Sequence, residues 1–126
     1  MSDVSCPFCS KAGVLFENDL AYVREDAFPV SEGHMLIISK RHAADWFSLF
    51  EEEQEAMISL LQQVKEYLDR RYHPDGYNIG LNCGAAAGQT VFHVHMHVIP
   101  RYRGDTPHPE GGVRGVIPAK QGYSRH

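Results

Sequence analysis

Three histidines alternate with apolar residues in the C-terminal third of the chain, within the run Gly-Gln-Thr-Val-Phe-His-Val-His-Met-His-Val from Gly88 to Val98. Successive side chains of an extended strand point to opposite faces, so His93, His95 and His97 are expected on one face and the apolar residues between them on the other. Imidazoles titrate close to neutral pH and suit metal ligation, nucleophilic attack or proton transfer. The pattern predicts a strand that packs with one face and does chemistry with the other.

Two cysteines near the N-terminus form a second candidate site, in the run Cys6-Pro7-Phe8-Cys9. A two-residue spacer can bring both thiolates onto one tetrahedral ion, but CxxC alone is half of a structural zinc site and is also compatible with a redox pair. A redox pair of the thioredoxin type lies within a βαβ pattern, whereas this motif precedes every element that the sequence predicts. The position favours a metal site, with redox chemistry as the alternative.

A loop of small residues, Cys83-Gly84-Ala85-Ala86-Ala87-Gly88, comes directly before the histidine run. Such a loop lets backbone N–H groups approach a phosphate, although this one lacks the spacing of a Walker-type loop and no helix follows it. Gln89 and Thr90 add an amide and a hydroxyl beside it. Two more polar residues, Asp26 and His34, lie at the edges of predicted strands, where ligand-binding groups are common. Spacing alone favours a turn role for Asp26.

The elements that position these residues follow from periodicity and turn residues. Strands are predicted at Val14–Glu17, Ala21–Glu25, Gly33–Ser39 and Tyr77–Asn82, followed by the histidine strand, with short connections typical of antiparallel pairing. A short helical or irregular segment is expected at Ala43–Leu49. One amphipathic helix is predicted to follow it, with Ser48 to Glu51 as a capping box of the S-x-x-E form and an end before Pro74.

Length and composition limit the classes of function. The chain has 126 residues, 43% hydrophobic and 22% charged, which suits one compact domain with a single core. The net charge of −4 and the scattered basic residues disfavour nucleic acid as the main partner, while small phosphorylated ligands stay open. No apolar run reaches membrane-spanning length and nothing resembles a signal peptide, so we expect a cytoplasmic protein. Three cysteines in that setting indicate thiols or metal ligands, not a disulfide framework.

The run from His93 to Ile99 resembles the signature of the histidine triad family of nucleotide hydrolases and transferases. The resemblance extends from Cys6 to about Arg103. Its further matches are Asp26, Gly33-His34, Lys40-Arg41-His42, Asn82 and Gly88-Gln89-Thr90-Val91. It implies an α+β fold with a five-stranded antiparallel sheet, one long and one short helix, and pairing as a dimer. Residues 1–103 then form the histidine triad domain, and 104–126 form a C-terminal extension that packs on the domain or on the dimer partner.

The resemblance also implies catalytic roles. His95 is then the nucleophile that attacks the α-phosphorus of a nucleoside phosphate, and water releases the mononucleotide from the covalent nucleotidyl-histidine. His97 is a phosphate contact and the proton donor to the leaving group, expected to be charged when His95 is neutral. His34 lies near the leaving group. Asp26 receives the ribose hydroxyls, which replaces its turn role. The implied contacts around the phosphate are Asn82, Gly88, Gln89, Thr90 and Val91.

The same resemblance implies a structural zinc site. Some bacterial members of the family bind zinc through an N-terminal CxxC and two histidines, and the matching residues are Cys6, Cys9, His42 and His93. Two sulfurs and two nitrogens suit tetrahedral zinc and leave no position open for a catalytic water. A different reading makes all three triad histidines ligands of one catalytic metal, and the presence of both cysteines and His42 makes it the least favoured.

The substrate is less constrained than the reaction. Dinucleoside polyphosphates such as diadenosine tetraphosphate, nucleoside phosphoramidates and adenylated amines all offer the same α-phosphate and ribose, and the resemblance favours a purine base. Basic residues of the tail are candidates for contacts with further phosphates: Arg103, His108, Arg114 and Lys120. The alternative function is a zinc-stabilised nucleotide-binding regulatory module with little turnover.

Overall fold

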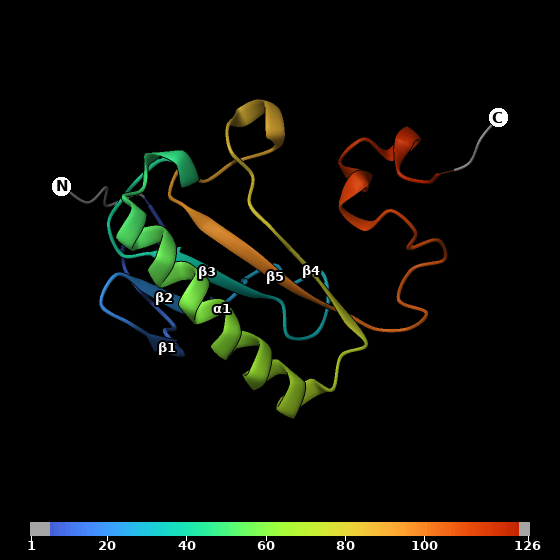
Figure 1. The fold of residues 1–126 in the computed structure, drawn as a ribbon, viewed down its shortest axis with the longest axis horizontal. Helices are drawn as coiled ribbons and strands as arrows, with labels where there is room; N and C mark the ends of the chain where they lie inside the picture. Colours follow the sequence, from blue (N-terminus) through green and yellow to red (C-terminus); the bar gives the residue numbers. More distant parts are fainter. Residues whose placement is uncertain (1–5, 124–126) are drawn as a thin grey trace.

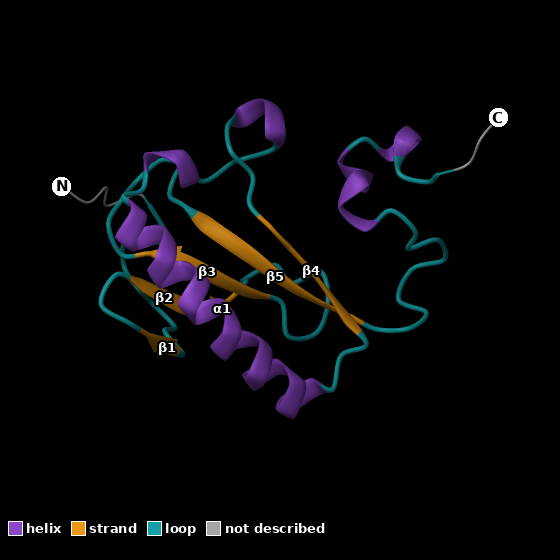
Figure 2. Cartoon of the chain, viewed as in Figure 1, coloured by secondary structure: helices purple, strands orange, loops and turns teal. Residues whose placement is uncertain are grey.

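The computed structural model describes residues 6–123, which form an antiparallel sheet with one long helix across one of its faces (Figures 1 and 2). The strands are β1 (Phe16–Glu17), β2 (Ala21–Glu25), β3 (Met35–Ser39), β4 (Gly76–Gly80) and β5 (His95–Arg101). Their order in the sheet is β1-β2-β3-β5-β4, and every neighbouring pair is antiparallel. The helix α1 spans Glu51–Tyr72, and the short 3-10 helix η1 spans Trp46–Ser48. The predicted α+β class and five-stranded sheet are confirmed.

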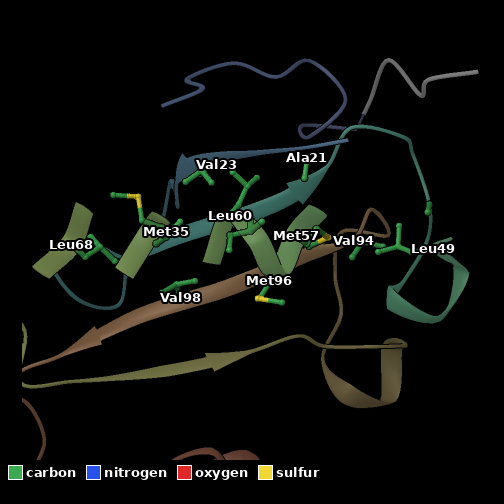
Figure 3. Close-up of a cluster of buried hydrophobic side chains, with 13 residues drawn as sticks. Ala21, Val23, Met35, Leu49, Met57, Leu60, Leu68, Val94, Met96 and Val98 are labelled. Atoms are coloured by element: carbon green, nitrogen blue, oxygen red, sulfur yellow. The ribbon is translucent and has the colours of Figure 1, made fainter. Parts of the chain in front are cut away.

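The core lies between the sheet and α1 (Figure 3). Met96 and Val98 of β5 are buried there because they alternate with the histidines along the strand. The helix contributes residues at helical spacing. These are Met57, Leu60, Val64 and Leu68, all fully buried. Burial of each such side chain stabilises the fold by about 1.5–3 kcal/mol. Since one face of β5 is used for packing, His95 and His97 project from the face that α1 leaves open.

The start of α1 differs from the predicted capping box. The N-cap of α1 is Phe50, whereas Ser48 lies in the preceding η1, whose own N-cap is Asp45, with a carboxylate that accepts the backbone N–H groups of η1. The long helix then begins after Phe50, whose N–H donates to Glu53 Oε1 at 2.7 Å. Glu53 is buried and also accepts two hydrogen bonds from Arg41 at 2.8 and 2.9 Å. The helix ends at Tyr72, as predicted from Pro74.

The strand bounds differ from the prediction where it matters for the site. β5 begins at His95, so His93 precedes the strand and is not held on the same face by its ladder. Val94 instead bonds to Ala43 and Ser39, which ties this entry segment to the connection after β3. The predicted strand Tyr77–Asn82 begins and ends earlier, as Gly76–Gly80. Asn82 therefore lies in a loop beyond the strand.

The C-terminal extension contains two short 3-10 helices, η3 (Gly112–Val116) and η4 (Pro118–Lys120). Figure 1 shows this segment, in red, beyond β4 and on the far side of the sheet edge from α1. Within residues 6–123, no helix is both long and apolar enough to cross a membrane. The division of the chain after residue 103 stays a prediction.

Candidate functional site

The candidate site lies on the sheet face opposite α1. Strand register aligns Arg24 on β2 with Leu36 on β3, and Leu36 with His97 on β5. A cleft of about 370 Å³ opens over this row. It collects most of the residues that the sequence nominated: Asp26, Asn82, Gly88, Thr90, Val91, His95 and His97. His34 lies behind it, buried against His97.

His95 has the geometry of a nucleophile. Its Nδ1 lies 2.8 Å from the backbone carbonyl oxygen of His93. A carbonyl only accepts hydrogen bonds, so this contact assigns the ring hydrogen to Nδ1. The Nε2 lone pair is then available to attack an electrophile in the cleft. The Phe8 ring packs against the imidazole, with ring centroids 4.8 Å apart.

A chain of hydrogen bonds fixes the tautomers of the two other histidines at the cleft. The Val30 backbone N–H donates to His34 Nδ1 at 3.1 Å, so His34 carries its hydrogen on Nε2. That Nε2–H lies 2.9 Å from His97 Nδ1 and 3.3 Å from Asp26 Oδ2. His97 therefore accepts at Nδ1 and carries its own hydrogen on Nε2. This chain of hydrogen bonds leaves the Nε2–H of His97 free to donate to a ligand. It is complete with a neutral His97 ring and does not require the positive charge expected from the sequence.

Electrostatics favours neutral forms of both rings. Burial lowers the pKa of His34, and the Asp26 carboxylate only partly opposes this effect. Burial also lowers the pKa of His97, and the neighbouring His95 and His34 lower it further against the opposing charge of Asp26. Desolvation therefore disfavours the imidazolium form of His97 in the ligand-free protein. The charged His97 expected from the sequence stays a prediction for the complex with substrate.

Gln89 has a different role from the predicted phosphate contact. Its side chain is buried, its Oε1 accepts from the Gly84 N–H at 2.8 Å, and its Nε2 donates to the carbonyls of Ala44 and Val91. These bonds occupy the amide and hold the small-residue loop in place. Gly88 ends that loop with φ of +94°, a left-handed conformation that favours glycine. Gln89 is a positioning residue for the loop, while Gly88 lines the cleft directly.

The four predicted zinc ligands converge at the other end of the histidine segment. The Sγ atoms of Cys6 and Cys9 lie 3.3 and 3.6 Å from His93 Nδ1, and Cys9 Sγ lies 3.1 Å from His42 Nδ1. Tetrahedral zinc, about 2.3 Å from sulfur and 2.0 Å from nitrogen, holds such atoms about 3.5 Å apart. His93 Nε2 donates to the Ser39 carbonyl at 2.6 Å, which leaves Nδ1 free as a ligand. The donor set fits zinc.

The structure contradicts a single catalytic metal held by the whole triad. His93 turns its Nδ1 to the cysteines, whereas His95 and His97 face the cleft. Asp26, His34 and His97 form a second group whose candidate ligand atoms lie within 4.8 Å of one another. A cation there would need the lone pair of His34 Nε2, but the Val30 N–H places the hydrogen on that atom. Hydrogen bonding, not metal binding, accounts for this group.

Several cleft residues were not singled out from the sequence, Phe8, Arg24 and Leu36 among them. Phe8 projects from between the two cysteines, Arg24 is two residues before Asp26 on the same strand face, and Leu36 forms the floor between Arg24 and His97. The strand period was the available signal for Arg24. The basic tail residues are not among those lining the cleft within the described chain, and Arg114 instead donates to the carbonyls of Lys120 and Gln121.

Comparison with known protein families decides the identity of the fold. The HIT domain profile matches residues 9–104, which include every residue lining the cleft except Pro7 and Phe8, and three of the four candidate zinc ligands. The chain belongs to the HIT family. It is 41% identical over 108 residues to a HIT-like protein of 16.1 kDa from Mycoplasma pneumoniae, covering 81% of this chain and 75% of that protein.

Two relatives of the HIT chain have names that describe an activity. An adenylylsulfatase from Arabidopsis thaliana is 35% identical over 106 residues, covering 79% of this chain and 54% of its own length. An AP-4-A phosphorylase from Mycobacterium tuberculosis is 29% identical over 93 residues, covering 73% of this chain and 48% of its own length. Among solved structures, a zinc-bound histidine triad family protein from Mycobacterium smegmatis aligns with a TM-score of 0.72 and 34% identity, covering 91% of this HIT chain and 92% of its own.

Proposed function

We propose that this HIT protein is a nucleotide hydrolase that cleaves at the α-phosphate of a nucleoside phosphate conjugate. The observation that carries the proposal is the pair of fixed tautomers, a free Nε2 lone pair on His95 beside an Nε2–H on His97. The names of the Arabidopsis and Mycobacterium relatives both describe reactions at nucleotide phosphates and support this class. Candidate substrates are dinucleoside polyphosphates such as diadenosine tetraphosphate, and nucleoside phosphoramidates.

The reaction proceeds in two displacements. In the first, His95 Nε2 forms a bond to the α-phosphorus while the bond to the leaving group breaks, and the leaving group takes a proton from His97. In the second, water attacks the same phosphorus, the P–N bond breaks, and His97 regains a proton from the water. Dividing one difficult displacement into two easier ones is the advantage of a covalent intermediate. The product is a nucleoside monophosphate.

The proton of His97 arrives with the substrate. The pKa of the His97 imidazole is lowered in the ligand-free protein. A negative phosphate placed beside the ring favours the imidazolium and raises that pKa. The added proton is then on Nδ1, which faces Asp26 Oδ2 at 3.7 Å, and His34 directs its Nε2–H to the same carboxylate. His34 and Asp26 hold the His97 ring from behind, and Asp26 retains acceptor capacity for ribose hydroxyls beside its bond from the Phe28 N–H at 2.8 Å.

Cys6, Cys9, His42 and His93 would hold a structural zinc ion. When bound, zinc cross-links the N-terminal segment to the sheet and takes no part in phosphate chemistry. The fit of the four donors and the zinc-bound Mycobacterium smegmatis relative support this assignment. His93 thus belongs to the metal site, and the remaining two triad histidines to the reaction.

A second candidate, a nucleotide-binding regulatory module with little turnover, has one observation in its favour. The lowered pKa of His97 reduces the fraction of protein that carries the proton for the leaving group. Such a module would bind mononucleotides in the same cleft. Turnover distinguishes it from the hydrolase.

The test is a substitution of the proposed nucleophile. His95→Asn removes the attacking nitrogen, so release of mononucleotide from adenosine phosphoramidate or diadenosine tetraphosphate should fall at least about 10³-fold, as expected for loss of a nucleophile. Binding of adenosine monophosphate, measured by calorimetry, should change little. Mass spectrometry of acid-quenched wild-type protein should find a nucleotidyl adduct at His95. Unchanged hydrolysis by His95→Asn would contradict the assignment, and absent turnover in the wild type with intact binding would favour the regulatory module.

A further inference from the structure

One cationic side chain in the cleft has no part in the reaction proposed above. Arg24 lies on β2, at the end of the cross-strand row that begins with His97 and passes over Leu36. It lines the same cleft as the two catalytic histidines. The backbone of Arg24 is thus two strands away from that of His97 across the sheet, and its guanidinium is separated from His95 by the Phe8 ring.

The separation matches the length of a nucleotide. Neighbouring strands lie about 4.8 Å apart, so two spacings place Arg24 and His97 about 10 Å apart across the sheet. A nucleoside monophosphate reaches about this far from its phosphorus to the outer edge of a purine. With the α-phosphate at His95, a base that extends along this row would lie over Leu36 and meet Arg24 with its edge. The ribose would lie between them, beside Asp26.

The walls between His95 and Arg24 suit a flat aromatic group. Pro7 and Phe8 form one side of the cleft, and Ala27 and Phe28 form another part of its lining. The Phe28 side chain is 86% exposed, so its ring is open to contact with a ligand. Bases stack favourably on aromatic side chains.

Contacts within the protein orient the Arg24 guanidinium but do not use all of its hydrogen-bond donors. It lies over the Phe8 ring at 5.7 Å, and its Nη1 donates to the Pro7 carbonyl at a long 3.4 Å. Its positive charge and a side-chain hydrogen bond also act on the Tyr22 hydroxyl, where they partly offset the burial that raises the pKa of Tyr22 to about 12. The nearest acid along the strand face, Asp26, is already engaged by the Phe28 N–H and by His34. An arginine has five N–H donors in a fork, so the donors not directed to Pro7 and Tyr22 are available to a ligand.

We infer that Arg24 reads the nucleobase and makes the protein selective for guanine over adenine nucleotides. Guanine presents two acceptors, O6 and N7, that match a bidentate guanidinium, whereas adenine presents a donor at N6 beside N7. An arginine facing adenine would place a donor against a donor. This inference rests on the proposed function, because the phosphate position sets where the base lies.

The opposing explanation is that Arg24 only braces the N-terminal segment through Pro7 and Phe8. A brace would affect all nucleotides equally. Reading of the base instead changes the ratio of affinities, which a purely structural role leaves unchanged.

The test compares three monophosphates by calorimetry with the zinc-loaded full-length protein. Guanosine and inosine monophosphates share O6 and N7, so both should bind about tenfold more tightly than adenosine monophosphate, within the range for a bidentate arginine contact. Arg24→Met keeps an aliphatic stem over Phe8 but removes the donors, and should reduce the ratio to about one. Arg70→Met is the matched control, since Arg70 is exposed on α1 across the sheet, and should retain the preference.

Each other outcome overturns the inference in a distinguishable way. Equal binding of all three nucleotides by wild-type protein, or tighter binding of adenosine monophosphate, contradicts base reading but not the proposed hydrolase. Equal losses for all three in Arg24→Met show a brace. Failure of wild-type protein to bind any of them contradicts the proposed function itself, and with it this inference.

Discussion

At the residue scale, the three triad histidines differ in which ring nitrogen forms a hydrogen bond within the protein and which is left free. A carbonyl acceptor on His95 Nδ1 frees Nε2 for attack, and a carbonyl acceptor on His93 Nε2 frees Nδ1 for a metal. His97 instead accepts at Nδ1, so its Nε2 keeps a hydrogen. Three residues of one type, spaced two apart, thus receive three roles from three different neighbours.

The neutral state of His97 leads to a prediction about proton uptake. Binding of a nucleotide phosphate raises the lowered pKa of His97. At pH 8 the ligand phosphate, with a pKa of about 6, is already ionised, so we expect the protein to take up at most about one proton on binding. Affinity should accordingly fall as pH rises. Calorimetry in buffers of different ionisation enthalpy measures the uptake. His97→Gln should abolish it.

The control for proton uptake is His73→Asn, at the left-handed C-cap of α1, a conformation that asparagine tolerates. It should keep the wild-type uptake. Uptake that persists in His97→Gln would assign the proton to another group.

The lowered pKa values of His34 and His97 also make the stability of the protein depend on pH. Folded His34 and His97 resist protonation, so the unfolded chain binds more protons and the ligand-free protein loses stability as pH falls below the ordinary value of 6.5.

At the element scale, local pattern predicted the strands and α1, because alternation and helical spacing act over a few residues. It also predicted that His95 and His97 share a face. It did not predict the role of Gln89, whose amide bonds to Ala44, 45 residues earlier in the chain. Arg24 was missed for a related reason. Its place in the cleft depends on the register of β2, β3 and β5, which pattern alone leaves open.

The segment from Cys6 to Cys9 connects the zinc site to the cleft. Its middle residues line the cleft, and the Phe8 carbonyl accepts the hydroxyl of buried Tyr22. Cys9→Ser should therefore lower zinc content and also weaken mononucleotide binding, because the wall formed by Pro7 and Phe8 loses its anchor. Loss of the cross-link should reduce the free energy of unfolding by on the order of 3 kcal/mol, as for a native disulfide. Metal analysis, calorimetry and thermal unfolding measure the three effects.

Cys83→Ser is the matched control for the zinc segment, since Cys83 is a free cysteine outside the four-residue metal group. It should keep zinc, binding and stability. Zinc loss in Cys9→Ser without any change in nucleotide affinity would show that the wall is independent of the metal. Phe8→Ala separates the two further: it should retain zinc and still lower kcat/KM, because the ring that packs against His95 is gone.

At the scale of the whole molecule, one region of the described surface suits a second copy of the chain. β4 is an edge strand, whose unpaired backbone groups can pair with another chain. A hollow of about 640 Å³ with mainly apolar lining lies between β4 and η3. Val113 and Val116 border it and are 63% and 76% exposed. Apolar side chains left open in this way mark interaction surfaces.

We expect the protein to be a homodimer that buries this hollow, with the extension 104–126 in the interface. Light scattering after size exclusion should give twice the chain mass of 14.2 kDa. Val116→Asp places a charge in the apolar contact, and an unpaired buried charge costs several kcal/mol, so the variant should elute as a monomer at micromolar concentration. Ile58→Asp is the control, because Ile58 is 50% exposed on α1, across the sheet from the hollow. A wild-type monomer, or a dimer that Val116→Asp leaves intact, would show that the exposed valines of η3 serve another contact.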